Sequence, residues 1–238
     1  MTPHGWLPRM SCDIGVVYTA RGSDVGSGPP HWRARFPRFI ESYLKYSPGI
    51  KPQLYIFYKE FATKEDLIWA RGQFEPMVNR IEILNHLDDK TTAGCTGICD
   101  DVEERLICPL NSSSEIMHDM WLKKLYDVFA LPGVSLVGCT GSREATPHIR
   151  DTAFLIDRVR YVTIAAQFDW VDPSRAGALN FEHGPNNLTQ QILHDGDKVF
   201  VVEKDRIIAP DEWGHTTYQG NLHNVLVLDR GARDYKDL

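Results

Sequence analysis

The chain has 238 residues, enough for one α/β domain of ordinary size or two small ones. Apolar residues make up 42% and charged residues 24%, which is typical of a globular protein in water. The net charge of −6 argues against an extended nucleic-acid interface, because such a surface needs a basic excess. No apolar run approaches the roughly 20 residues that span a bilayer, and the first residues lack the apolar core of a signal peptide. These features predict no nucleic-acid partner and no transmembrane segment; they favour a cytoplasmic location and leave peripheral membrane attachment open.

The five cysteines are scattered and odd in number, which favours reduced thiols over a disulfide framework. Cys12, Cys108 and Cys139 lie in or beside apolar runs and are expected to be small buried hydrophobes. Cys95 and Cys99 are four residues apart, but a second well-spaced ligand pair is lacking. A zinc site there is the weaker alternative.

Strands and helices alternate in the first half of the chain. Residues 13–19, 53–58 and 80–84 are rich in β-branched and aromatic side chains and are expected to be strands. Apolar residues recur at helical spacing between Phe36 and Tyr46, and Thr63 with Asp66 indicates the start of a second helix. Short connections between such elements predict a parallel sheet with right-handed crossovers.

An apolar run at residues 106–110 ends abruptly in four small polar residues, Asn111, Ser112, Ser113 and Ser114. In an open α/β sheet, ligands bind at the carboxyl ends of the strands. Short polar side chains and backbone N–H groups there suit an anionic or hydroxyl-rich ligand. A helical pattern follows at once, from Ile116 to Phe129. Later strands are expected at residues 134–138, 153–156, 198–203 and 224–229, with a short helix at 187–195 that ends at Gly196.

A second polar segment follows the first expected strand and contains Thr19, Arg21 and Asp24. In a doubly wound sheet this loop contacts a nucleotide, so Arg21 suits a phosphate and Asp24 a ribose or base edge. A solvated turn is the alternative. The glycine spacing matches neither GxGxxG nor a P-loop, so dinucleotide and ATP binding are not predicted.

A third polar segment begins after the expected strand at 134–138, with Gly141 and Ser142, and continues to His148 and Arg150. The glycine allows the backbone to approach a ligand or to turn sharply. His148 and Arg150 are candidates to contact an acceptor or a diphosphate. A single histidine in a loop is more often structural, and that alternative stays open.

The fourth segment holds Glu182 and His183, which we expect to lie outside a helix and ahead of the turn at residues 184–185. A carboxylate held there is a candidate general base toward a hydroxyl group, and His183 is the fallback base. The alternative is an ordinary surface glutamate. Asn186 or Asn187 is expected to cap the helix that follows.

Several runs in the second half resemble a group of bacterial glycosyltransferase-like proteins, related to the family 2 type of GT-A glycosyltransferase. Their pattern reads C-x-LNS-x-S, WL-x-KL, PGV-x-LVG-x-TGS, PHIR-x-x-AF and FE-x-G-x-N-x-LT-x-QIL-x-x-G. The resemblance covers most of residues 105–238, whereas the first hundred residues support it only through the alternation of strands and helices. The matching runs are residues 108–114, 121–125, 132–142, 147–154 and 181–196.

The resemblance implies a single GT-A-like domain over residues 1–238, with a Rossmann-like mixed sheet flanked by helices. Residues from about 10 to 110 would form the nucleotide-binding half, and residues from about 111 to 238 the acceptor-binding half. It implies transfer of a sugar from a UDP-, dTDP- or GDP-sugar to a hydroxyl of a glycan or glycoconjugate, with inversion, in polysaccharide biosynthesis. The implied donor contacts are Thr19, Arg21, Asp24, Asn111, Ser112 and Ser113, the acceptor contacts are Gly141, Ser142, His148 and Arg150, and the catalytic residues are Glu182 and His183.

The resemblance also raises a question about metal. Asn111 and Ser113 stand where metal-dependent relatives carry the carboxylates of a DxD motif, and neutral groups bind Mg²⁺ or Mn²⁺ weakly. We therefore expect no metal ligand there. Three explanations stay open: arginines meet the donor phosphates, a single carboxylate holds Mg²⁺ or Mn²⁺ with the phosphates, or activity is lost. The arginines are Arg21, Arg143 and Arg150, and the carboxylates are Glu115 and Asp119.

Two rival functions remain from the sequence. The first is a non-catalytic nucleotide- or sugar-binding module of a larger polysaccharide synthesis system. The second is a nucleotidyltransferase, which would need a basic glycine-rich phosphate loop after the first strand, where only Arg21 is basic.

Overall fold

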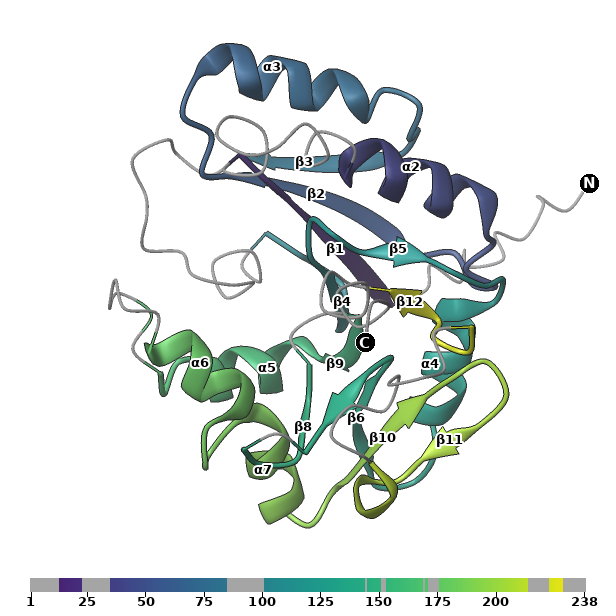
Figure 1. The fold of residues 1–238 in the computed structure, drawn as a ribbon, viewed down its shortest axis with the longest axis vertical. Coiled ribbons are helices and arrows are strands. Elements are labelled where there is room, and N and C mark those ends of the chain that lie inside the picture. Colours follow the sequence, from purple (N-terminus) through teal and green to yellow (C-terminus); the bar gives the residue numbers. More distant parts are fainter. Residues whose placement is uncertain are drawn as a thin grey trace, which may run out of the picture.

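The computed structural model describes residues 13–22, 35–84, 101–143, 145–150, 153–168, 170, 176–213 and 223–228. The expectations for Cys12, Asp24, Cys95 and Cys99 lie outside these ranges. An eight-stranded sheet runs through the molecule, with α2 and α3 on one side and α5, α6 and α7 on the other (Figure 1).

The strand order in the large sheet is β11-β10-β6-β9-β4-β1-β2-β3, and two small two-stranded sheets pair β5 with β12 and β7 with β8. The strands are β1 (Ile14–Arg21), β2 (Gln53–Lys59), β3 (Arg80–Leu84), β4 (Leu106–Leu110), β5 (Glu115–Ile116), β6 (Val134–Gly138), β7 (Gly141–Ser142), β8 (His148–Ile149), β9 (Phe154–Asp157), β10 (Lys198–Val202), β11 (Ile207–Ile208) and β12 (Val227–Leu228). The helices are α2 (Arg35–Lys45), α3 (Lys64–Gln73), α4 (Trp121–Phe129), α5 (Arg158–Ala165), α6 (Ala176–His183), α7 (Leu188–His194) and the 3-10 turn η3 (Pro210–Glu212).

The first half of the chain folds as its alternating pattern predicts. Strand β1 pairs in parallel with β2 on one side and β4 on the other, and β2 pairs in parallel with β3. The predicted helix start is also confirmed, because the Thr63 side chain accepts a hydrogen bond from the Asp66 N–H at 3.0 Å. A polar cap of this kind satisfies an N–H group that the first helical turn leaves without a partner.

The second half contains an antiparallel strand, which the alternation of elements did not indicate but which agrees with the mixed sheet that the resemblance implied. Strand β9 lies between β4 and β6 and runs antiparallel to both, so the sheet is mixed. Its last residue, Asp157, accepts hydrogen bonds from the N–H groups of Val159 and Arg160 and so caps α5. Helices α5 and α6 were not predicted, because their apolar residues do not form a clear helical stripe.

The helix expected directly after the four polar residues begins later. Residues Glu115 and Ile116 form β5 and pair with β12, and the Ile116 N–H donates to Ser42 Oγ at 3.0 Å. Met120 has a left-handed backbone, with φ of 63°, and α4 starts at Trp121. Ile116 is therefore buried because it pairs with a strand that lies far away in the sequence. The spacing of apolar residues around Ile116 does not indicate this pairing.

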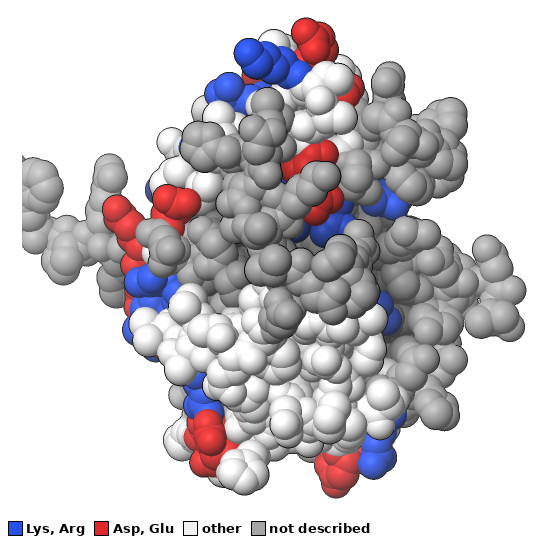
Figure 2. Space-filling view, turned by 90° about the vertical axis from the view of Figure 1, so that its left-hand side faces the viewer, with Lys and Arg blue, Asp and Glu red and all other residues white. Residues whose placement is uncertain are grey.

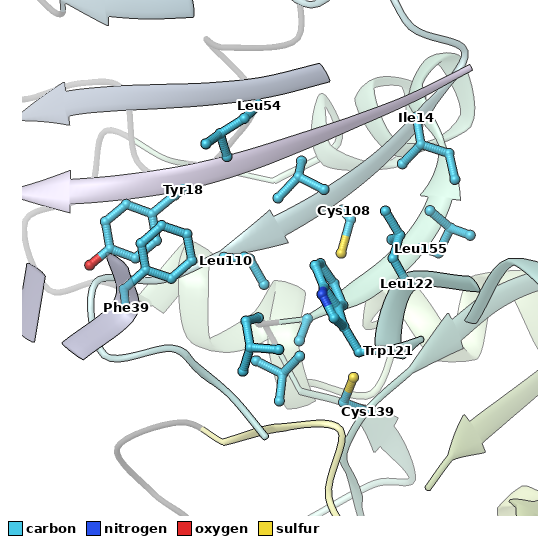
Figure 3. Packing of buried hydrophobic residues seen from close by; sticks show 14 of the residues in the cluster. Ile14, Tyr18, Phe39, Leu54, Cys108, Leu110, Trp121, Leu122, Cys139 and Leu155 are labelled. Carbon is cyan, nitrogen blue, oxygen red and sulfur yellow. The ribbon is translucent and has the colours of Figure 1, made fainter. Parts of the chain in front are cut away.

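The sheet separates two apolar cores, one beneath α2, α3 and α4 and the other beneath α5, α6 and α7. In the first core Tyr18 stacks on Phe39 with ring centroids 3.8 Å apart. Trp121 lies between Cys108 and Cys139 (Figure 3). Both thiols are buried, as predicted, and burial raises the pKa of Cys139 well above its usual value.

Replacing Trp121 by alanine tests the first core. Trp121 is fully buried, so the W121A variant is expected to lose about 3–5 kcal/mol of unfolding free energy through lost transfer energy and a residual cavity. Leu131 is 49% exposed and provides the control L131A. Urea denaturation measures both variants, and an equal loss in the two would contradict this account of the core.

Candidate functional site

The polar segments predicted from sequence gather at one edge of the sheet. Strands β1 and β4 are parallel, and β4 and β6 are both antiparallel to β9, so all three carboxyl ends point to the same edge. Each of these ends is followed by a polar segment. Strand ends at a common edge form the crevice in which open α/β sheets bind ligands.

The segment after β4 is a turn that Asn111 organises. Its side-chain oxygen accepts hydrogen bonds from the Ser113 N–H at 2.9 Å, the Ser113 hydroxyl at 2.8 Å and the Ser114 hydroxyl at 3.3 Å. The Ser112 carbonyl accepts from the Tyr18 hydroxyl at 2.9 Å. The three serines are buried or nearly so. Asn111 therefore holds the turn in shape, a role that is seen only in the folded chain.

The Asn111 turn does not fit a Mg²⁺ or Mn²⁺ ion. Residues 111–114 offer only neutral oxygen atoms, and the Asn111 amide oxygen is already engaged by three donors. Asp119, one of the two carboxylates considered for such an ion, accepts from the Ser47 N–H at 2.8 Å in the loop that leads into the amino end of β2. It therefore lies toward the opposite edge of the sheet, and Glu115 in β5 is the candidate carboxylate that remains.

The end of β1 is packed closely on the end of β2. The Gly22 N–H donates to the Lys59 carbonyl at 2.8 Å, and a Cβ atom at Gly22 would lie 2.3 Å from the Phe61 Cα. Only glycine allows this approach. Arg21 Nε lies 3.3 Å from Glu60 Oε2, so the guanidinium predicted to meet a phosphate is in an exposed ion pair at the expected edge. Thr19 is half-buried in β1.

The segment after β6 forms a hairpin that brings the predicted acceptor residues together. Gly141 pairs with Ile149, and Ser142 pairs with His148. The Arg150 N–H donates to the Thr140 carbonyl at 3.2 Å and extends the pairing. The hairpin packs directly on the sheet, because a Cβ atom at Gly138 in β6 would lie 2.5 Å from the Ile149 side chain.

The two candidate bases lie in a helix and not in the predicted loop. Glu182 and His183 are the last two residues of α6, which ends directly before the glycine at position 184. A nitrogen of His148, a nitrogen of His183 and a carboxylate oxygen of Glu182 all lie within 4.8 Å of one another. We call these three residues the His–Glu–His cluster; it is the metal-capable group found among the described residues. His148 is buried, whereas the Glu182 and His183 side chains are 20% and 37% exposed.

A partly buried hydrogen-bond network connects the segment that carries His148 with the helix end that carries Glu182 and His183. The Thr146 hydroxyl donates to the His183 carbonyl at 2.9 Å, with the Gly184 carbonyl 3.1 Å away. Asn187 Nδ2 donates to Thr146 Oγ1 at 2.8 Å and to the Gly184 carbonyl at 3.0 Å. The Asn187 side-chain oxygen accepts from the Gln190 N–H, which confirms Asn187 as the predicted cap of α7. Thr146 carried no signal in the sequence, since its role depends on contacts 37 to 41 residues away.

The hairpin and the Asn111 turn are connected through Ala153. Its N–H donates to the Pro109 carbonyl at 2.7 Å, and its carbonyl accepts from the Cys139 N–H at 2.9 Å. The end of β4, the end of β6 and the segment that leads from His148 are thus neighbours. Among the described residues, the polar segments that follow β4 and β6 are therefore close to each other at one edge of the sheet.

Two surface hollows are lined by described residues. The larger, about 600 Å³, is mostly apolar and lies at the amino end of β2, away from the polar segments. The smaller, about 350 Å³, lies beside α6 and is lined by Gln167, Phe168, Ala176, Gly177, Asn180, Pro185 and Asn186. Amide groups and an aromatic ring in the smaller hollow are suited to a polar organic ligand.

No family model and no characterised protein sequence matches this chain. Its structure is similar to the mannosyltransferase PcManGT from Pyrobaculum calidifontis in complex with GDP-Man and Mn²⁺, with a TM-score of 0.57 and 12% identity. The match covers 82% of this chain and 55% of that one, so the chain spans about half the length of the mannosyltransferase. The fold is GT-A-like, as the sequence resemblance implied.

Two weaker similarities are to S. aureus TarS 1–349 and to 4-diphosphocytidyl-2C-methyl-D-erythritol synthase from Anaerococcus prevotii. TarS has a TM-score of 0.44 and 8% identity, covering 66% of this chain and 50% of that chain. The synthase has a TM-score of 0.49 and 12% identity, covering 79% and 86%. Among the residues that the structure describes, no helix is both long and apolar enough to cross a membrane.

Replacing Asn187 by aspartate tests the network that positions the cluster. The N187D variant keeps the oxygen that caps α7 but replaces the amide donor by an oxygen facing Thr146 Oγ1 and the Gly184 carbonyl. A lost donor at a buried site is expected to cost about 1–3 kcal/mol of unfolding free energy. The exposed neighbour Asn186 gives the control N186D, for which thermal denaturation should show little change. Equal stability of the two variants would contradict the proposed role of the amide.

Proposed function

We propose that this chain transfers a sugar from a nucleoside-diphosphate sugar to a hydroxyl of a glycan or glycoconjugate, with inversion at the anomeric carbon. The observation that supports the proposal is that two kinds of polar group follow strand ends at the same edge of the sheet. The buried polar turn at Asn111 follows β4, and the proton-accepting His–Glu–His cluster lies beyond the hairpin that follows β6. The GT-A-like fold supports the same reading, since the similar mannosyltransferase was solved with GDP-Man.

The donor is proposed to lie along the ends of β1 and β4. Thr19, Arg21 and Asp24 contact the nucleotide, while Asn111, Ser112 and Ser113 contact the donor through the turn after β4. The diphosphate that leaves carries a growing negative charge, which a guanidinium can balance through charge-assisted hydrogen bonds. Arg21 lies at this edge in an exposed ion pair that a phosphate can replace.

The acceptor is proposed to lie along the hairpin, in contact with Gly141, Ser142, His148 and Arg150. Glu182 accepts the proton of the acceptor hydroxyl as that oxygen forms its bond to the anomeric carbon. The bond between the anomeric carbon and the phosphate oxygen breaks, and the nucleoside diphosphate departs with that electron pair. His183 Nδ1, 3.9 Å from Glu182 Oε2, is the second candidate base.

The charge on this side of the molecule favours a neutral acceptor. Figure 2 looks at the left-hand side of Figure 1, and the centre of its lower half is uncharged among the described residues, with acidic and basic side chains along the lower margin. Helices α5, α6 and α7 lie at this height in Figure 1. The 350 Å³ hollow beside α6 contributes amides and an aromatic ring to the same side. A hydroxyl-rich glycan matches such a surface better than an anionic one does.

Nucleotide binding is the first test of this proposal. Thermal-shift titration with UDP, GDP, dTDP and CMP, with and without Mn²⁺, should show stabilisation by at least one nucleoside diphosphate. The R21Q variant should weaken that binding about tenfold or more, the usual effect of losing a charged hydrogen-bond donor. The control is R105Q, because Arg105 lies at the amino end of β4 in an exposed ion pair with Asp13. Stabilisation by none of the nucleotides, or equal weakening by R105Q, would contradict the proposed donor site.

Proton transfer by Glu182 is the second test. The E182Q variant should bind the nucleotide as the wild type does and lower the rate of sugar transfer roughly 100- to 10,000-fold, because glutamine cannot accept the proton. The control is E75Q, since Glu75 is exposed beyond the end of α3. Initial rates measured with a chelator and again with added Mn²⁺ check the prediction. An undiminished rate in E182Q would exclude Glu182 as the base, and nucleotide binding without any transfer in the wild type would favour a non-catalytic module.

A further inference from the structure

We propose that the His–Glu–His cluster binds a divalent transition-metal ion of the Zn²⁺ type through His148, Glu182 and His183, with a fourth position open to solvent or ligand. This binding goes beyond the proposed sugar transfer and does not depend on it. The site is separate from the Asn111 turn, whose neutral oxygens do not suit an ion. The ligands come from β8 and from the last turn of α6.

The spacing of the three side chains suits a single ion. Their nearest ligand atoms lie within 4.8 Å of one another. Ligand atoms about 2.1 Å from a tetrahedral zinc ion lie roughly 3.4 Å apart. Rotation about the side-chain bonds of the partly exposed Glu182 and His183 can bring their ligand atoms to this shorter separation, while buried His148 stays in place.

The hydrogen bond on His148 prepares its ring for a metal. His148 Nδ1 lies 2.7 Å from the Thr146 carbonyl oxygen, which can only accept, so Nδ1 carries the proton. In the neutral ring Nε2 then has the lone pair that a metal needs. Metal-binding histidines in proteins commonly donate their other N–H to a backbone carbonyl in this way, which fixes the ring and raises its basicity.

Thr146, whose carbonyl orients His148, also positions the helix end that carries Glu182 and His183. The Thr146 hydroxyl donates to the His183 carbonyl, and buried Asn187 donates to Thr146 Oγ1. The segment that carries His148 and the helix end that carries Glu182 and His183 are thus connected by half-buried Thr146, which buried Asn187 holds in place. Such preorganisation reduces the cost of bringing three ligands together.

The ligand types decide which ion is bound. Two imidazoles and one carboxylate favour Zn²⁺ and neighbouring transition metals over Mg²⁺ and Ca²⁺, which prefer all-oxygen sites. Three protein ligands with an open fourth position are the arrangement of zinc sites that exchange a water or ligand. An ion bound here occupies the Glu182 carboxylate, so the base proposed above acts in the metal-free protein.

Direct metal titration of the full chain tests this inference. Chelator-treated protein is titrated with Zn²⁺ by calorimetry, and Co²⁺ is added separately as an optical probe. We expect one saturable site and a visible Co²⁺ spectrum of low coordination number without the charge-transfer band of a thiolate ligand. Mg²⁺ should not compete at tenfold excess over Zn²⁺. No saturable site, or a thiolate band that points to cysteine ligands, would overturn the assignment.

Two matched histidine variants locate the ion. His183 and His194 each lie in the last turn of a short helix, α6 and α7. H183A should weaken Zn²⁺ binding at least about tenfold, while H194A should leave it unchanged. E182Q should also weaken it, and circular dichroism of the metal-free variants checks that each is folded. Equal affinities of H183A and H194A would overturn the proposed site, and this result would leave the nucleotide-binding test of the proposed function unaffected.

Discussion

The relative position of the polar segments after β4 and β6 depends on Ala153. This fully buried residue donates its N–H to Pro109 at the end of β4 and accepts from Cys139 after β6. Its φ of 54° is a left-handed conformation that costs a non-glycine residue roughly 1–2 kcal/mol, which the bonds on both sides must offset. Strand β9, which begins directly after Ala153, is paired with both β4 and β6. This pairing fixes the Asn111 turn and the hairpin relative to each other.

The polar groups that follow β4 and β6 differ in their chemistry. The Asn111 turn is neutral, and its amide oxygen is engaged in holding the turn, so it suits hydrogen bonding to a ligand and not metal coordination. The cluster of His148, Glu182 and His183 offers two imidazoles and a carboxylate, which are able to accept protons or to hold an ion. Half-buried Thr146 and buried Asn187 are hydrogen-bonded to each other and connect the two segments that carry the cluster. Nucleotide binding and metal binding therefore depend on different residues.

Much of the fold could be predicted from local pattern. The strand at 80–84, the strand at 134–138, the cap at Thr63 and the cap at Asn187 all follow from side-chain chemistry within a few residues. The expected helix was confirmed from Trp121 to Phe129, but its expected start at Ile116 was wrong, because Ile116 pairs with β12, more than a hundred residues away. Glu182 was wrongly placed in a loop, because α6 lacks the apolar stripe by which a helix is recognised.

The sequence by itself determined the alternation of strands and helices, the polar segments after β1, β4 and β6, and a set of candidate polar side chains within them. Those features depend on contacts between near neighbours in the chain, which composition and spacing record directly. Only the tertiary structure decided that β9 runs antiparallel, that Asn111 organises a turn, and that His148 meets Glu182 and His183. These outcomes depend on hydrogen bonds and packing between distant segments, whose free energies no local pattern contains.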